Sequence, residues 1–292
     1  MWTFRAPNNM NRLQRVERWL AVIFLSLSVS ALLLFGLSAF RSRGADPHNA
    51  VAAIAAAVAD AASAQTPSEE TYLEVTDGCG PYFQGTCVNV RSGPGSDYAD
   101  VGNLRSGMVL RVGETRVRDG HTWYRVVFDE SVRYPDRISK EWWVAGDYVR
   151  IFQHQGPQEL APNETASSTK HIVVDRGDQM LYAYDGDTLF MQEPISSGLD
   201  GTPTPRGTFH IFKKTPSRYM QGPLPGVSDQ YYDLPGVPWD LYFTHEGAAI
   251  HGAYWHDKFG EQWSHGCVNL PVEKARELYE WADLGTPVTV HD

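Results

Sequence analysis

The chain has 292 residues, of which 42% are hydrophobic, with 35 acidic and 25 basic side chains and a formal net charge of −10. This length is enough for about two domains, and the apolar fraction excludes a wholly disordered chain. The acidic excess argues against a nucleic-acid-binding protein, and three cysteines are too few for a disulfide-dense scaffold.

The first predicted element is an apolar segment at residues 19–40, WLAVIFLSLSVSALLLFGLSAF, which contains no charged residue. As a helix it is about 33 Å long, which matches the hydrocarbon thickness of a bilayer. Four arginines and one glutamate precede it, Arg5, Arg12, Arg15, Arg18 and Glu17. This positive flank favours a cytoplasmic N-terminus, so we expect residues 1–43 to be a cytoplasmic tail and a single-pass membrane anchor. A buried soluble helix and a cleaved signal peptide are the alternatives.

Two linkers and a small β module are expected next. Residues 44–70 are first Ala-rich and then polar, which is typical of a flexible linker. Between residues 71 and 152, short apolar segments alternate with turn residues, a pattern that predicts a small β-barrel. Residues 153–169, QHQGPQELAPNETASST, are polar without apolar periodicity, and we interpret them as a second linker.

Three segments of this module, VNVRSGPGSDYADVGNLRSGMVLRV, WYRV and WWVAGDYVR, resemble the bacterial SH3-like domain. The resemblance implies a domain that docks on cell-wall peptide or glycan. A purely structural spacer domain is the alternative.

Cys79 and Cys87 lie on either side of the short segment GPYFQGT. Two nearby cysteines in an oxidising compartment favour a disulfide, whereas free thiols or metal ligands are the alternatives. Their pairing leaves Cys267 as the odd cysteine of the chain.

Strand patterns resume at residue 170 and continue to the C-terminus. The segments Ile172–Val174, Gln179–Tyr184 and Gly207–Phe212 are apolar or alternating, and Val288–Val290 is a further strand candidate. Between them, Val272, Ala275, Leu278, Tyr279 and Ala282 recur at helical spacing after Pro271. Residues 170–292 are therefore predicted to be a mostly β domain with one clear helix.

Three histidines and the remaining cysteine fall close together in this domain, at His251, His256, His265 and Cys267. A thiol beside an imidazole can act as a nucleophile, because the imidazole generates or stabilises the thiolate. A His₃Cys zinc site and an inert structural cysteine are the alternatives. Glycines beside His251 and Cys267 suit backbone donors that approach a substrate closely.

The segments AIHGAYWH and SHGCVNL resemble the L,D-transpeptidases of bacterial peptidoglycan synthesis. The family pattern is a histidine, a spacer, and Ser/Thr-His-Gly-Cys followed by a hydrophobic residue and Asn or Arg. Ser264–Asn269 fills this pattern without a gap, and the segments PRGTF and LPGVPW also look like family segments. The resemblance implies a β-sandwich domain of the L,D-transpeptidase type, with one or two helices, over residues 170–292.

Site residues are implied by the same resemblance. Cys267 is the expected nucleophile, His251 the base, and the carbonyl of Gly252 the group that orients the imidazole. Backbone N–H groups of His265, Gly266 and Cys267 are expected to bind the oxyanion. Substrate contacts are expected from Gly247, Ser264, Asn269, Tyr219, Tyr232 and Trp239, whereas His256 and His210 are interpreted as structural.

The implied reaction is acyl transfer through a Cys267 thioester that joins the third residues of two peptidoglycan stem peptides. No metal or cofactor is expected, and the expected partners are stem peptides, the cell wall and the membrane. The expected location is the bacterial cell membrane, with the domains outside the cytoplasm. An L,D-carboxypeptidase, another cell-wall cysteine peptidase and a non-catalytic wall-binding protein are the alternatives.

Overall fold

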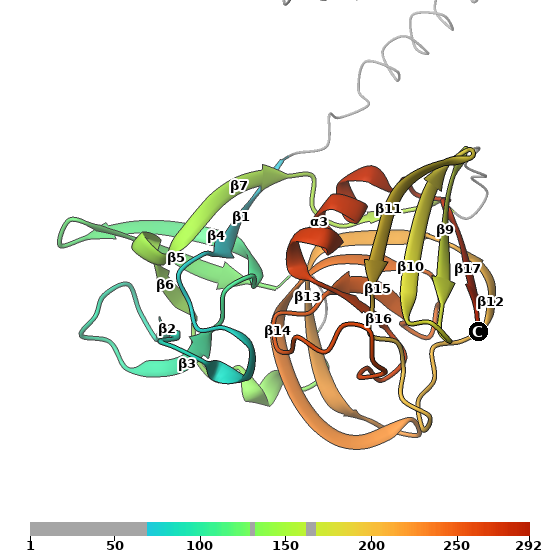
Figure 1. Cartoon of the computed structure of the whole chain (residues 1–292). Coiled ribbons are helices and arrows are strands. Elements are labelled where there is room, and N and C mark those ends of the chain that lie inside the picture. The colour runs from blue at the N-terminus through green and yellow to red at the C-terminus, as the bar shows by residue number, and fades with distance from the viewer. Residues whose placement is uncertain (1–68, 129–131, 162–167) are drawn as a thin grey trace, which may run out of the picture. The chain divides into compact units, whose positions relative to one another are not determined.

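The computed structural model of the protein (Figure 1) describes residues 69–128, 132–161 and 168–292. They belong to one compact unit, Pro67–Asp292. Within these three ranges no helix has both the length and the apolar character needed to cross a bilayer. The predicted anchor at residues 19–40 and nearly all of the predicted linker at residues 44–70 lie outside the described residues.

The described part of the chain is mainly β with one α-helix, which confirms that prediction. Its strands are β1 (Glu70–Val75), β2 (Val88–Arg91), β3 (Asp100–Leu104), β4 (Val109–Arg118), β5 (His121–Val127), β6 (Trp143–Ala145), β7 (Val149–His154), β8 (Gln158–Glu159), β9 (Lys170–Asp175), β10 (Met180–Asp185), β11 (Thr188–Pro194), β12 (Gly207–His210), β13 (Lys213–Leu224), β14 (Ser228–Tyr242), β15 (Ala249–Gly252), β16 (Val268–Leu270) and β17 (Pro287–His291). The helices are α3 (Val272–Trp281) and three single 3₁₀ turns, η1 (Pro81–Phe83), η2 (Pro135–Arg137) and η3 (Gly146–Tyr148).

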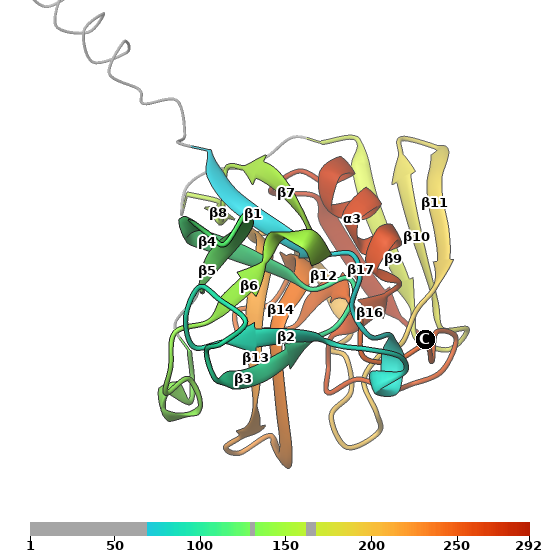
Figure 2. The same cartoon turned by 90° about the vertical axis from the view of Figure 1, so that its left-hand side faces the viewer.

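The N-terminal strands form one seven-stranded antiparallel sheet in the order β3-β2-β6-β5-β4-β1-β7, seen in Figure 2. The strand β1 lies between β4 and β7, next to one edge of this sheet. The predicted disulfide forms between Cys79 and Cys87. It closes the loop that contains η1.

Two five-stranded sheets make up the C-terminal part, in the orders β11-β10-β9-β17-β12 and β16-β15-β14-β13-β8. Alternation along β9 and β17 turns Ile172, Val174, Val288 and Val290 inward, where they share one core with strands of the second sheet. The helix α3 adds Ala275, Leu278 and Tyr279 to that core, at the spacing of one helix face. The sheets therefore form a sandwich.

The N-terminal sheet and the sandwich share apolar cores. Tyr72 and Val109 belong to the core of the sandwich, and Val237 and Tyr254 belong to the core of the N-terminal sheet. The strand β4 lies against β13 and β14. The two parts therefore depend on each other for burial of their apolar side chains.

The predicted linker at residues 153–169 is wrong for its first half. His154 ends β7, and β8 pairs with β13 at the edge of the second sandwich sheet. The N–H of Leu160 also donates to the carbonyl of Phe212. A short polar strand at a sheet edge carries no apolar alternation, so the sequence pattern gave no sign of it. Residues 162–167 lie outside the described residues.

Replacement of both Cys79 and Cys87 by serine is expected to lower the free energy of unfolding by about 2–4 kcal/mol, because the loop loses its covalent closure. The loss is expected in a single transition of the whole unit, because the cores are shared. Urea unfolding followed by both far-ultraviolet circular dichroism and tryptophan fluorescence measures this. Two separate transitions would contradict the shared-core interpretation.

Candidate functional site

Two short parallel strands bring the candidate catalytic side chains together. His251 on β15 lies opposite Asn269 on β16. Cys267 directly precedes Val268, which lies opposite Ile250, the residue before His251. The free, buried thiol of Cys267 and His251 therefore come from neighbouring positions of this strand pair.

The imidazole of His251 is fully buried, with 0% of the residue exposed. Its Nδ1 lies 3.1 Å from the carbonyl oxygen of Gly252, whereas its Nε2 has no hydrogen-bond partner among the described residues. Because a carbonyl only accepts, Nδ1 carries the proton and Nε2 presents a lone pair. Burial lowers the pKa of His251 to about 3, so the resting imidazole is neutral.

The thiol of Cys267 lies beside a cation that the sequence analysis missed. The Nη1 atom of Arg218 on β13 donates to the carbonyl oxygen of Gly247 at 3.3 Å, and the Sγ of Cys267 lies 4.0 Å from the same oxygen. The same Nη1 is 3.9 Å from a carboxylate oxygen of the fully buried Asp240. Burial raises the pKa of Cys267, and the charge of Arg218 opposes that rise.

Gly247 thus contacts Arg218 and lies near Cys267 through its backbone carbonyl, whereas its substrate contact stays a prediction. Its φ of +104° falls in the left-handed half of conformational space, which favours glycine. Arg218 has no local motif around it, and only the pairing of β13 with β14 brings it close to Cys267.

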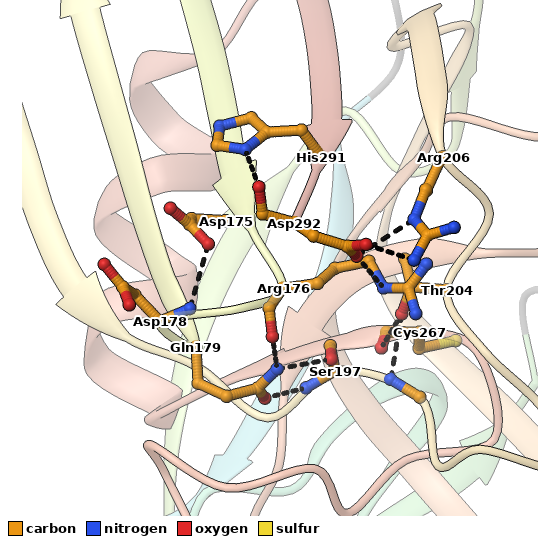
Figure 3. Close-up of polar contacts among 11 residues, drawn as sticks. Asp175, Arg176, Asp178, Gln179, Ser197, Thr204, Arg206, Cys267, His291 and Asp292 are labelled. Atoms are coloured by element: carbon orange, nitrogen blue, oxygen red, sulfur yellow. Dashed lines mark hydrogen bonds and ion pairs between the residues drawn. The ribbon is translucent and has the colours of Figure 1, made fainter.

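Two hydroxyl groups hold the carbonyl of Cys267. Ser264 Oγ donates to it at 2.6 Å, and Thr204 Oγ1 donates at 3.3 Å, the latter drawn in Figure 3. Ser264 Oγ also accepts the N–H of Gly266 at 3.1 Å. The hydroxyl of Ser264 is buried in the loop, and the substrate contact of this residue stays a prediction. The predicted oxyanion donor Gly266 has its N–H committed to the same hydroxyl.

The loop between β11 and β12 contacts the segment that carries Cys267, and Gln179, which directly precedes β10, holds this loop in place. Gln179 accepts the N–H of Ser197 and donates to its hydroxyl, as Figure 3 shows. Backbone bridges then join Ser196 to Asn269 and Gly198 to Ser264. Thr204, which ends this loop, was missed by the sequence analysis although it directly precedes the recognised segment PRGTF.

Asn269, for which a substrate contact is predicted, is enclosed by protein in this structure. Only 2% of the residue is exposed, and its amide nitrogen lies 2.9 Å from Nε2 of His256. Nδ1 of His256 accepts the N–H of Lys258, and burial lowers the pKa of His256 to about 4. Both ring nitrogens of His256 thus contact polar groups of neighbouring residues, which agrees with a structural role. Within the described ranges, no group of three His, Cys, Asp or Glu side chains is placed to hold a metal ion.

The three aromatic candidates have different environments. Trp239 is 2% exposed and packs between Phe152 and Tyr279 in the sandwich core. Tyr219 packs against Phe128 and Trp142. Both rings are buried among apolar side chains. Local spacing does not show these neighbours, which come from distant segments, and the predicted substrate contacts of the two residues stay predictions.

Tyr232 is the aromatic candidate that lies at the site. Its ring stacks on the imidazole of His265, with 5.7 Å between ring centroids. Nε2 of His265 is also 2.6 Å from the side-chain oxygen of Gln230. Burial raises the pKa of Tyr232, and the negative charge that Cys267 carries as a thiolate raises this pKa further. The hairpin of β13 and β14 therefore holds the residue that precedes Gly266 and Cys267.

The buried His251 predicts that stability depends on pH. Its folded pKa of about 3 lies below its ordinary value of 6.5. The unfolded chain therefore binds more protons between these values, and stability falls as the pH falls through this window. At about pH 5 the loss due to this group is on the order of 2 kcal/mol.

Chemical denaturation at neutral and mildly acidic pH measures this effect. His251→Gln is expected to lose less stability on acidification than the unmodified chain, whereas His210→Gln, at an exposed position, is expected to match it. Equal acid sensitivity of the His251 variant and the unmodified chain would contradict the prediction.

Comparison with known proteins adds an independent finding. Residues 169–290 match the family model of the YkuD L,D-transpeptidase catalytic domain. The chain is 27% identical over 165 residues to L,D-transpeptidase 1 of Mycobacterium tuberculosis, which covers 51% of this chain and 64% of that protein. It is 33% identical over 104 residues to the probable L,D-transpeptidase 3 of the same species, which covers 34% and 38%.

Among solved structures, a crystal structure of a mutant Enterococcus faecium L,D-transpeptidase has 28% sequence identity and a TM-score of 0.39, and covers 43% of this chain and 50% of that one. The chain thus spans less than two thirds of these relatives' own length. Residues 169–290, which contain His251, Gly252 and Cys267, are therefore similar to an L,D-transpeptidase catalytic domain of the YkuD family.

Proposed function

We propose that the protein is a peptidoglycan L,D-transpeptidase, which transfers the acyl group of one stem peptide to an amine of another through a thioester on Cys267. The observation that carries the proposal is Nε2 of His251, which has no hydrogen-bond partner among the described residues while the Gly252 carbonyl holds Nδ1, on the strand that pairs with the one that Cys267 directly precedes. This arrangement supplies a neutral base to a thiol, without a carboxylate.

In the first half of the reaction, Nε2 of His251 takes the proton of the thiol as Sγ attacks the carbonyl of the third stem residue. The positive charge of Arg218 favours the developing thiolate, which burial otherwise disfavours. The C–N bond to the fourth residue, a D-alanine in the family, then breaks, and His251 returns the proton to the leaving amine. The products are the thioester and free D-alanine.

The tetrahedral oxyanion needs donors that are not already committed. We assign the backbone N–H groups of His265 and Cys267 to this role, because the N–H of Gly266 already donates to Ser264. The hydroxyls of Ser264 and Thr204 fix the carbonyl of Cys267 and hence the orientation of its peptide unit.

In the second half, the amine of a neighbouring stem attacks the thioester and gives its proton to His251. The C–S bond breaks, and the thiolate of Cys267 takes the proton from His251. An amide bond between the third residues of two stems results. If water replaces the amine, the same site acts as an L,D-carboxypeptidase.

We further propose roles for the rest of the chain. Residues 19–40, which lack charge over a bilayer-spanning length, serve as a membrane anchor, with residues 44–70 as a tether. The region 71–152 acts as an SH3-like wall-binding domain ahead of the catalytic domain at 170–292. Binding of the protein to isolated cell walls, with Cys267→Ala to exclude capture through a covalent adduct, tests the wall-binding role.

The charge of Arg218 predicts how the thiol titrates. Because the pKa of Cys267 is raised above the ordinary value of 9.0, alkylation by iodoacetamide is expected to keep accelerating as the pH rises past that value. Arg218→Gln removes the opposing charge, so alkylation at neutral pH is expected to slow roughly tenfold for each unit of further pKa rise.

Arg218→Lys retains the charge and is expected to stay closer to the unmodified chain. A plateau of the alkylation rate below pH 9.0, or equal pH profiles of Arg218→Gln and the unmodified chain, would argue against this electrostatic role.

The function itself is tested by mass spectrometry with the full-length protein, a tetrapeptide muropeptide and excess labelled D-amino acid. The unmodified chain and the control His210→Gln are expected to yield the labelled exchange product. Cys267→Ala is expected to yield none while it keeps the circular dichroism of the unmodified chain. Tripeptide without exchange would identify an L,D-carboxypeptidase, and product formation by Cys267→Ala would refute the mechanism.

A further inference from the structure

The turn η2 in the N-terminal sheet region contacts the hairpin of β13 and β14, the long orange hairpin of Figure 1. Arg137 at the end of η2 donates from Nη2 to the carbonyl oxygen of Gly222 at 2.8 Å and from Nη1 to that of Tyr232 at 3.2 Å. Gly222 and Tyr232 are opposite each other in the β13–β14 register. One guanidinium therefore ties together the two strands of the hairpin.

Further contacts make this a specific attachment. Nη1 of Arg137 lies 3.4 Å from the carboxylate of Asp233. The guanidinium packs between the rings of Tyr134 and Tyr231, 4.2 Å and 4.3 Å from their centroids. A planar cation with several donors suits two carbonyls, a carboxylate and two aromatic faces at once, which a lysine ammonium does not.

Tyr134 adds a second connection from the same turn. Its N–H donates to the side-chain oxygen of Gln221 at 2.8 Å, and its hydroxyl donates to the carbonyl of Pro223 at 2.8 Å. Gln221 in turn donates to the carboxylate of Asp233 at 3.0 Å. The hairpin is thus held at consecutive residues on β13 and at two residues on β14.

Side chains of the same hairpin segment also contact the candidate active site. A Cβ at Gly222 would lie 2.3 Å from the ring of Tyr232, so that ring lies directly over the glycine backbone. The same ring stacks on His265, and Gln230 of β14 is hydrogen-bonded to the His265 imidazole. His265 is followed by Gly266 and Cys267. The carbonyls that Arg137 binds therefore belong to the two residues that set the place of the Tyr232 ring.

We propose that Arg137 is a positioning residue of the candidate active site: it fixes the β13–β14 hairpin so that Tyr232 and Gln230 hold His265, and with it the backbone that carries Cys267. The inference rests on the proposed acyl transfer only for its kinetic consequence. Because η2 precedes β6 in the chain, this role of Arg137 gives the N-terminal sheet region a part in positioning the catalytic residues.

The test compares Arg137→Gln with Arg125→Gln in the full-length protein. Arg125 is a matched control because it lies in the same sheet region, is also partly exposed, and pairs with one carboxylate, that of Glu114. Arg137→Gln is expected to speed amide hydrogen exchange in residues 228–234 and alkylation of Cys267 several-fold, because Tyr232 no longer stays stacked on His265. The control is expected to change neither.

Arg137→Gln is also expected to lower kcat for acyl transfer by roughly tenfold to a hundredfold, with a smaller effect on KM, because a misplaced donor costs catalysis more than binding. Arg137→Lys is expected to fall between Arg137→Gln and the unmodified chain, because an ammonium keeps the charge but lacks the planar fork that spans both strands and stacks on two rings. If Arg137→Gln matches Arg125→Gln in hairpin exchange and in thiol alkylation, the proposal is wrong.

A milder variant covers the case in which Arg137→Gln loosens the whole unit. Tyr134→Phe removes only the hydrogen bond to Pro223, and a local rise in exchange at residues 221–224 is expected. If hydrogen exchange at residues 221–224 does not rise in Tyr134→Phe, the proposal is wrong. If the unmodified chain shows no acyl transfer, the proposed function fails, whereas hairpin exchange and thiol alkylation still decide the role of Arg137.

Discussion

The arrangement of the site depends on the complete burial of the His251 imidazole against the carbonyl of its neighbour Gly252. Removal from water keeps the ring neutral, and the carbonyl fixes which nitrogen carries the proton. The parallel pairing of β15 and β16 brings His251 near the residue that precedes β16, Cys267, and Arg218 supplies the positive charge that a buried neutral pair lacks.

The residues that local spacing could identify are those in the chemistry-bearing motif. His251, Gly252 and Cys267 lie within one continuous stretch, and the helix that follows shows its apolar periodicity directly. Local spacing does not show in the same way which polar and aromatic side chains are buried. Asn269, Ser264 and Trp239 have residue types that suit a substrate surface, yet all three are buried.

Arg218 and Arg137 could not be found from the sequence, because their roles depend on pairings between distant segments. An arginine on a strand is an ordinary surface residue until the register of β13 and β14 places it beside Gly247. Arg137 is in a short turn far from the motif along the chain, and only the tertiary contact between η2 and the hairpin gives it acceptors. The polar strand β8 escaped prediction for the same reason.

The strand β8 has a consequence for where this chain can be divided. A cut at residue 169, which the family match alone suggests, would leave the backbone groups of β13 that now pair with β8 unpaired at an open sheet edge. It would also remove Phe152 and Tyr72 and so uncover the apolar face around Trp239. An open strand edge next to a bared aromatic surface is a template for self-association. An isolated catalytic fragment would therefore be limited by its solubility rather than by its chemistry.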